Sequence, residues 1–224
     1  MEIPKLNEKV AYHKQRSHRI EALADGVFAI AMTLLVLDIR LPLGEMNTEK
    51  EVWFSLLHVL PKILTFIFTF LIAGLFWTTF ANQFNYIHSA DRNENVLAIF
   101  YLLFISLLPF SASFLSDHLE SKVAVGFYIL NIFIVAQTLR VHWLYCYHTG
   151  LVKTEENNEA VIHKTLMKRA NFATTMYIIA GICCYFNSSI ALGILIFLQT
   201  FFTFNGFMEL IKNRKKKALT PDKR

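Results

Sequence analysis

Two carboxylates bracket an apolar segment near the N-terminus, and their position makes them the strongest candidates for chemistry in this sequence. Asp25 and Asp38 enclose twelve residues that are apolar or small apart from Thr33. As a helix this segment measures about 18 Å, less than the roughly 30 Å of hydrocarbon in a bilayer. Acidic groups at such a depth are costly unless they face protein or water, and by default they mark function. The segment is therefore predicted to line a water-filled pathway through the membrane.

The other chemistry-bearing residues form no converging set. The histidines beyond the N-terminal leader show neither a His-x-x-His nor a His-x-x-x-His spacing, and the cysteines match no zinc-ligand spacing. They are His58, His88, His118, His142, His148, His163, Cys146, Cys183 and Cys184. The sequence therefore predicts no enzyme, no cofactor and no fixed metal site. A proton-coupled transporter that titrates Asp25 or Asp38 stays open, although interrupted helices in paired halves are missing.

The composition identifies the elements that must position these residues. Of the 224 residues, 54% are apolar and only 17% are charged, whereas soluble domains carry about a quarter charged residues. We therefore expect an all-α integral membrane protein, because six stretches meet or approach the roughly 20 apolar residues that a membrane helix needs. These stretches are 20–41, 63–81, 96–115, 123–144, 172–186 and 190–211.

The distribution of Lys and Arg predicts the orientation of the six spans. Seventeen of the 22 basic residues lie before the first span, after the second, after the fourth or after the sixth. Only Arg40, Lys50 and Lys122 lie in the opposite loops. Basic loops stay in the cytoplasm, so both termini are predicted to be cytoplasmic and the protein to lie in the cell membrane. The expected organisation is a basic N-terminus (1–19), a membrane domain (20–211) and a basic tail (212–224).

The loops have predicted roles of their own. The tail segment 212–217 is read as a topology anchor that meets anionic lipid, and not as a nucleic-acid site. The pattern of residues 52–60, before Pro61, predicts a short amphipathic turn at the outer surface. Residues 146–170 are predicted to form a long solvated loop. The first outer loop is net acidic and is either a cation-concentrating vestibule or an ordinary solvated loop. Its charges are Asp38, Glu45, Glu49 and Glu51 against Arg40 and Lys50.

A helical projection separates the faces of the first span. Ile30, Leu34 and Leu37 fall on one stripe, Thr33 lies at its edge, and Asp25 lies on the far side. Asp25 is therefore expected to face another helix that offers a donor such as an indole N–H. From spacing alone, the apolar stripe is either a simple helix-packing surface or the lining of a pathway.

The segment from Arg19 to Asp25 resembles the R-x-x-x-F-S-D signature of the first helix in the transmembrane protein 175 family of endolysosomal-type potassium channels and their prokaryotic relatives. Leu23 and Ala24 stand at the Phe and Ser positions. Further features agree with the family, while Phe80 replaces its usual His. The agreeing features are Phe76-Trp77 ending the second span, Asp91 in the next loop and Leu108-Pro109-Phe110 late in the third span.

This resemblance implies a potassium-selective channel, a homotetramer of six-span subunits in which four first helices line a central pore. By position, Ile30, Leu34 and Leu37 would form stacked apolar rings, with Thr33 adjoining the narrow part. Arg19, Asp25 and Trp77 would hold the helix in place. The sequence contains no T-V-G-Y-G filter, so gating by dewetting of a narrow apolar ring would take the place of carbonyl coordination.

Overall fold

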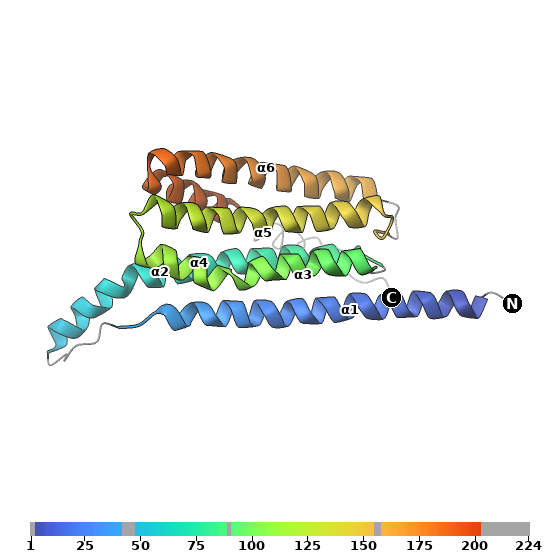
Figure 1. Cartoon of the computed structure of the whole chain (residues 1–224), viewed down its shortest axis with the longest axis horizontal. Coiled ribbons are helices and arrows are strands. Elements are labelled where there is room, and N and C mark those ends of the chain that lie inside the picture. The colour runs from blue at the N-terminus through green and yellow to red at the C-terminus, as the bar shows by residue number, and fades with distance from the viewer. Residues whose placement is uncertain (1–2, 42–47, 89–90, 155–157, 203–224) are drawn as a thin grey trace, which may run out of the picture.

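The computed structural model describes residues 3–41, 48–88, 91–154 and 158–202, with side chains from His18 onward. They form α-helices and one 3-10 turn, arranged as a bundle of long, roughly parallel or antiparallel rods (Figure 1). The elements are α1 (Ile3–Leu34), η1 (Leu35–Asp38), α2 (Glu49–Phe84), α3 (Arg92–Ser106), α4 (Leu108–Asp117), α5 (Lys122–His148) and α6 (Glu159–Phe186). A further apolar helix, Ser188–Phe202, follows α6.

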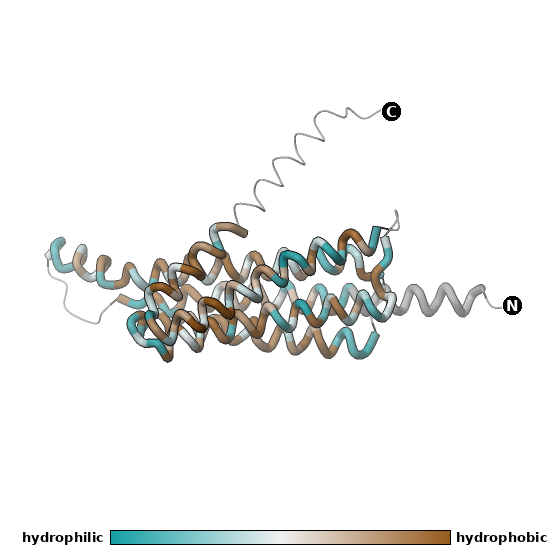
Figure 2. The backbone as a smooth tube through the Cα atoms, turned by 90° about the horizontal axis from the view of Figure 1, so that it is seen from above, coloured by the Kyte–Doolittle hydropathy of each residue, from teal (hydrophilic) through white to brown (hydrophobic). Residues whose placement is uncertain are grey.

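Four segments in the described part of the chain are long and apolar enough to cross a membrane: His18–Asp38, Glu49–Phe84, Arg92–Asp117 and Lys122–His148. They correspond to the first four expected spans, and Figure 2 shows apolar residues along much of their length. The fifth expected span lies within α6. The sixth begins in Ser188–Phe202 and ends outside the described residues.

The segment before Pro61 is not a separate turn, contrary to the expectation for 52–60. It is the first part of α2, a single helix of 36 residues with Pro61 inside it. Thr48 and Glu51 form a capping box that starts the helix, so helix formation begins well before the proline. At about 1.5 Å per residue α2 measures roughly 54 Å. Its first turns project beyond the other helices (Figure 1).

The expected loop 146–170 is also largely helical. Helix α5 continues to His148 and α6 begins at Glu159. Between them Gly150 adopts a φ of 72°, and Leu151 N–H donates to the Cys146 carbonyl at 3.0 Å, which closes the helix end. An isolated antiparallel bridge then joins Val152 to Ile87. This bridge ties the α5–α6 connection to the α2–α3 connection.

Helix α5 lies at the centre of the bundle and α1 lies at its edge. Helix α5 packs against α3, α4 and α6, whereas α1 packs against α2, α3 and α4. In Figure 1, α1 and α6 occupy opposite sides of the molecule. Large side chains such as Tyr101, Tyr128 and Trp143 fill the core between them. From His18 onward, this edge position leaves one face of α1 without a packing partner among the described residues.

Candidate functional site

Helix α1 has two distinct faces. Its buried residues recur every three or four positions, which is the period of a helix packed along one side. They are Ile20, Ala24, Phe28 and Ala31 on α1, followed by Leu35 at the start of η1. Phe28 reaches the ring of Tyr101 on α3, with 6.1 Å between the ring centroids. These contacts fix the rotation of α1 and therefore decide which residues point away from the bundle.

The predicted pore-lining stripe lies on the other face. The exposed fractions are 61% for Ile30, 45% for Leu34 and 61% for Leu37. Thr33 is exposed beside them, and its hydroxyl donates to the carbonyl oxygens of Ala29 and Ile30 at 2.9 Å. Because that hydroxyl is bonded within its own helix, it leaves the stripe predominantly apolar. The subunit thus presents a continuous apolar surface that nothing in the same subunit covers among the described residues.

Asp25 and Trp77 meet across α1 and α2. The indole N–H of Trp77 donates to Asp25 Oδ1 at 2.8 Å. Arg19 is exposed on α1 and forms no hydrogen bond or ion pair with either residue in the described part of the chain. Two of the three residues that the family resemblance assigns to one network are therefore in direct contact. They join the proposed pathway helix to its neighbour near the start of the apolar segment.

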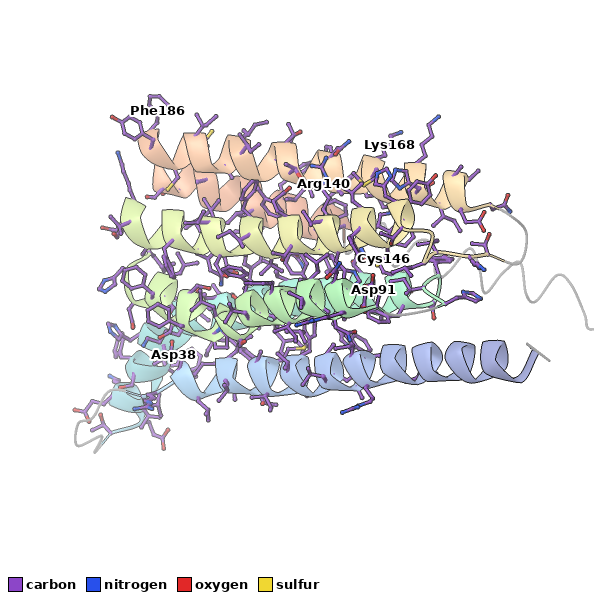
Figure 3. The ribbon with its side chains drawn as sticks, turned by 45° about the vertical axis from the view of Figure 1, so that its right-hand side comes forward. Asp38, Asp91, Arg140, Cys146, Lys168 and Phe186 are labelled. Atoms are coloured by element: carbon purple, nitrogen blue, oxygen red, sulfur yellow. The ribbon has the colours of Figure 1, made fainter. Side chains whose placement is uncertain are left out.

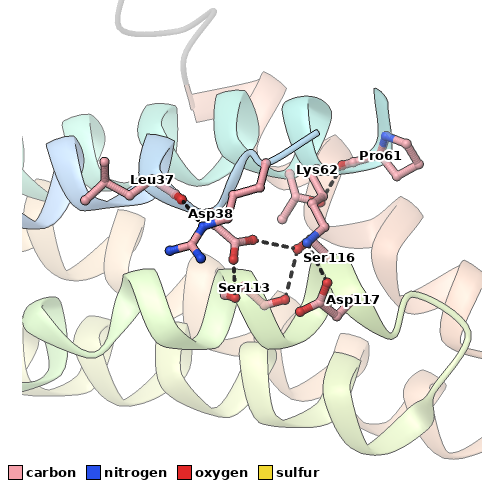
Figure 4. Close-up of polar contacts among 9 residues, drawn as sticks. Leu37, Asp38, Pro61, Lys62, Ser113, Ser116 and Asp117 are labelled. Carbon is pink, nitrogen blue, oxygen red and sulfur yellow. Dashed lines mark hydrogen bonds and ion pairs between the residues drawn. The ribbon is translucent and has the colours of Figure 1, made fainter. Parts of the chain in front are cut away.

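Asp38 is held against α4. Its two carboxylate oxygens accept hydrogen bonds from Ser113 Oγ at 2.6 Å and Ser116 Oγ at 3.1 Å (Figure 4). Beside this contact, Lys62 Nζ lies 2.7 Å from Asp117 Oδ1. The Asp38 side chain therefore points toward α4, whereas the sequence left open whether Asp38 belongs to a cation-concentrating vestibule or to an ordinary solvated loop. Glu45, the other predicted vestibule residue, lies outside the described residues.

One polar cluster was not predicted from the sequence. His142 on α5 contacts Glu94 Oε1 through Nε2 and Gln83 Oε1 through Nδ1, each at 3.1 Å. His142 and Glu94 are 0% exposed. Phe80, which stands where the family usually has His, lies 5.4 Å from the His142 ring centroid. Sequence spacing gave no sign of this cluster, because the partners of His142 are 59 and 48 residues away in sequence.

Asp91, a family feature in the sequence, caps the start of α3. Its Oδ1 accepts from the Glu94 N–H at 2.7 Å, and its other oxygen accepts from the Tyr145 hydroxyl. Asp38 and Asp91 lie at opposite ends of the bundle (Figure 3). Acidic side chains thus anchor helix contacts at both ends. Among the described residues, no three His, Cys, Asp or Glu side chains are grouped to hold a metal ion.

Together, the apolar helices and the bracketed α1 define an all-helical membrane protein. Residues 19–109 match the family model described as "Endosomal/lysosomal potassium channel TMEM175". The chain belongs to this TMEM175 family, as the resemblance in α1 indicated. The matched region begins at Arg19 and ends at Pro109, so it includes the Asp25–Trp77 contact.

Bacterial relatives cover most of the chain. A protein from Streptomyces collinus named a potassium channel is 31% identical over 138 residues, which is 60% of this chain and 66% of that one. A potassium channel from Chamaesiphon minutus is 24% identical over 200 residues, covering 86% and 96%. The crystal structure of a potassium-selective TMEM175 homolog from Chamaesiphon minutus has the same fold, with a TM-score of 0.76, 23% identity and coverage of 85% and 98%.

The similarity to vertebrate relatives is more restricted. The chicken protein named endosomal/lysosomal proton channel TMEM175 is 37% identical over 111 residues. That match covers 46% of this chain and 22% of the chicken protein. The chain therefore spans about a fifth of the length of this relative.

Proposed function

We propose that the protein is the subunit of a passive potassium channel in the cell membrane, with a pore lined by α1 from each of four subunits. The names of the bacterial relatives and the shared fold support potassium as the conducted ion. In this proposal the channel needs no cofactor and catalyses no reaction. Its partners are potassium ions, membrane lipid and further copies of the same chain, and not nucleic acid.

The observation that carries this proposal is the exposed apolar stripe of α1. Ile30, Leu34 and Leu37 point away from every helix described in their own subunit. Four such stripes around a central axis form stacked apolar rings, and a narrow apolar ring closes a pore by dewetting. Thr33 adjoins these rings. The constriction favours potassium over sodium because potassium gives up its hydration water more easily.

Polar contacts hold the pore segment at both ends. Asp25 is fixed by Trp77 near the cytoplasmic end, and Asp38 is fixed by Ser113 and Ser116 near the outer end. The stripe lies between these anchors, so its rotation is set by contacts that the permeating ion does not touch. Arg19 extends the inner anchor in the assembled channel. Asp38 and Glu45 contribute negative charge to the outer vestibule, where it concentrates cations.

The subunit crosses the membrane six times in this proposal. Helix α6 and the apolar helix that begins at Ser188 supply the fifth and sixth spans. An even number of spans puts both termini on one side, and the excess of Lys and Arg assigns that side to the cytoplasm. The basic segments 1–19 and 212–224 then flank the membrane domain at the inner surface.

Potassium and sodium flux into liposomes tests the proposal. The purified protein is expected to pass potassium down its gradient, faster than sodium and without a proton gradient. Ile30→Ala widens the constriction, so it raises flux and lowers the preference for potassium. Ile99→Ala is a matched control, because Ile99 is similarly exposed, at 54%, but lies on α3.

The possible results separate the alternatives. Equal changes in Ile30→Ala and Ile99→Ala, or no change in either, would contradict the ring assignment. Flux that consumes a proton gradient in fixed proportion to potassium would instead identify a proton-coupled transporter centred on Asp25 or Asp38.

A further inference from the structure

An open polar pocket lies at the end of the bundle where α1 ends and α2 enters the membrane domain. Its volume is about 770 Å³, within the range of roughly 300 to 1,000 Å³ that is typical of small-molecule sites. Residues after η1, on α2, on α4 and in the α4–α5 connection line it. The charged or titratable ones are Arg40, His58, Lys62, Asp117, His118 and Glu120. We call it the α2–α4 pocket.

Two opposite charges in this pocket lack an ionic partner among the described residues. Lys62 is already paired with Asp117 (Figure 4). Arg40 donates through Nε to the Leu37 carbonyl at 3.4 Å, and its terminal guanidinium nitrogens have no hydrogen-bond partner among the described residues. Glu120 is exposed and has no ion pair in the described part of the chain. The pocket therefore offers one cation and one anion to an incoming molecule.

Large apolar side chains close in sequence to the pocket-lining residues are exposed. Val123, one residue after the start of α5, is 72% exposed, and Leu60 and Leu64 on α2 are 44% and 58% exposed. Pro61, Lys62 and Ser121 line the pocket. In the sequence, Leu60 and Leu64 lie on either side of Pro61 and Lys62, and Val123 follows Ser121 by two residues. Exposed apolar side chains are therefore sequence neighbours of the pocket-lining residues on both α2 and the start of α5.

We propose that the α2–α4 pocket binds the headgroup of an amine-bearing zwitterionic phospholipid. The phosphate pairs with the Arg40 guanidinium, whose planar donors suit phosphate geometry. The primary amine of the headgroup pairs with the Glu120 carboxylate. Acyl chains lie along the apolar surface near Leu64 and Val123. In the orientation proposed above this lipid belongs to the outer leaflet, but the binding itself does not depend on ion conduction.

The charge pair selects this ligand over its neighbours. An anionic lipid without an amine leaves the Glu120 carboxylate facing a phosphate, which is unfavourable. A quaternary ammonium headgroup cannot donate a hydrogen bond to Glu120. A metal cation has no reason to lie beside Arg40, and the described residues contain no three-ligand group for one.

Native mass spectrometry of the delipidated full-length protein tests the proposal by counting bound lipid. The probes are phosphatidylethanolamine, phosphatidylcholine and phosphatidylglycerol. The wild-type protein is expected to prefer phosphatidylethanolamine. Arg40→Gln lowers the affinity for it about tenfold, the usual effect of losing one charge-assisted hydrogen bond. Glu120→Gln removes the preference over phosphatidylcholine. Arg92→Gln changes an exposed cation at the start of α3 and leaves binding unchanged.

Three results would overturn the proposal. The first is equal binding of all three lipids by the wild-type protein. The second is displacement of the lipid by soluble glycerophosphoethanolamine at the same concentration as the lipid, which would identify a soluble zwitterion as the ligand. The third is a changed subunit number in Arg40→Gln with unchanged lipid binding, which would identify the pocket as a contact between copies of the chain. None of these readouts measures flux, so the channel proposal succeeds or fails separately.

Discussion

Replacement of His142 by leucine tests how strongly the buried cluster holds the bundle together. The imidazole joins α5 to Glu94 on α3 and to Gln83 on α2, at 3.1 Å in each case. His142→Leu places an apolar side chain of similar size at a site that is 0% exposed. The variant therefore removes two polar contacts while leaving the packed volume nearly unchanged.

The expected loss of stability is large because the contact is fully desolvated. Removing one partner of a buried ionisable pair costs about 3–5 kcal/mol, since Glu94 then loses its contact with the imidazole in a medium of low dielectric constant. For a chain of 224 residues, each kcal/mol lowers the melting temperature by about 2–4 °C. The melting temperature of His142→Leu should therefore fall by roughly 6–20 °C.

Thermal unfolding in detergent, followed by intrinsic tryptophan fluorescence, measures this effect. The double variant His142→Leu/Glu94→Met should recover much of the lost stability, because an apolar pair avoids a buried carboxylate that has lost its imidazole. His88→Leu, which changes an exposed histidine, is the control. A His142→Leu protein that melts within about 2 °C of wild type, or a double variant that is no more stable than His142→Leu, would refute the reasoning.

Further predictions concern the other contacts. Trp77→Phe removes the donor to Asp25 and should lower the free energy of unfolding by about 1–2 kcal/mol, because the indole is partly exposed; denaturant titration measures this, and unchanged stability would show that the bond contributes little. Ser116→Ala should cost about 1 kcal/mol by the same assay, since Asp38 keeps one of its serine donors. Burial, and then the nearby His148, lower the pKa of His163 below its usual 6.5. At mildly acidic pH the folded state therefore binds fewer protons at His163 than the unfolded state does. The free energy of unfolding consequently decreases as the pH falls below about 6.5. His163→Gln should flatten this acid-side loss in a series of melting curves, and an identical pH profile would contradict the assignment.

The sequence predicted the features that depend on local pattern. Long apolar runs indicated a helical membrane protein, and the family signature from Arg19 to Asp25 was confirmed by the family match. The projection of α1 placed Ile30, Leu34 and Leu37 on one face, and the structure shows that face exposed. These properties follow from helix periodicity and hydropathy, which neighbouring residues determine.

Local pattern was less informative where helices begin and end. Pro61 suggested a boundary, but α2 continues through it from a capping box at Thr48. Polar residues after Cys146 suggested a long loop, but α5 and α6 extend into it. Polarity marks solvent exposure in such segments and does not distinguish an exposed helix from a loop.

The sequence by itself determined that Asp25 and Asp38 bracket an apolar segment. It also determined that both carboxylates need polar partners or water, because burying either charge in hydrocarbon is costly wherever the helix packs. Only the tertiary structure decided their partners. Asp38 meets Ser113 and Ser116, which are 75 and 78 residues away, and His142 meets Glu94 across 48 residues. Such pairs arise when separate helices pack at a particular rotation and depth, and no spacing within one helix encodes that choice.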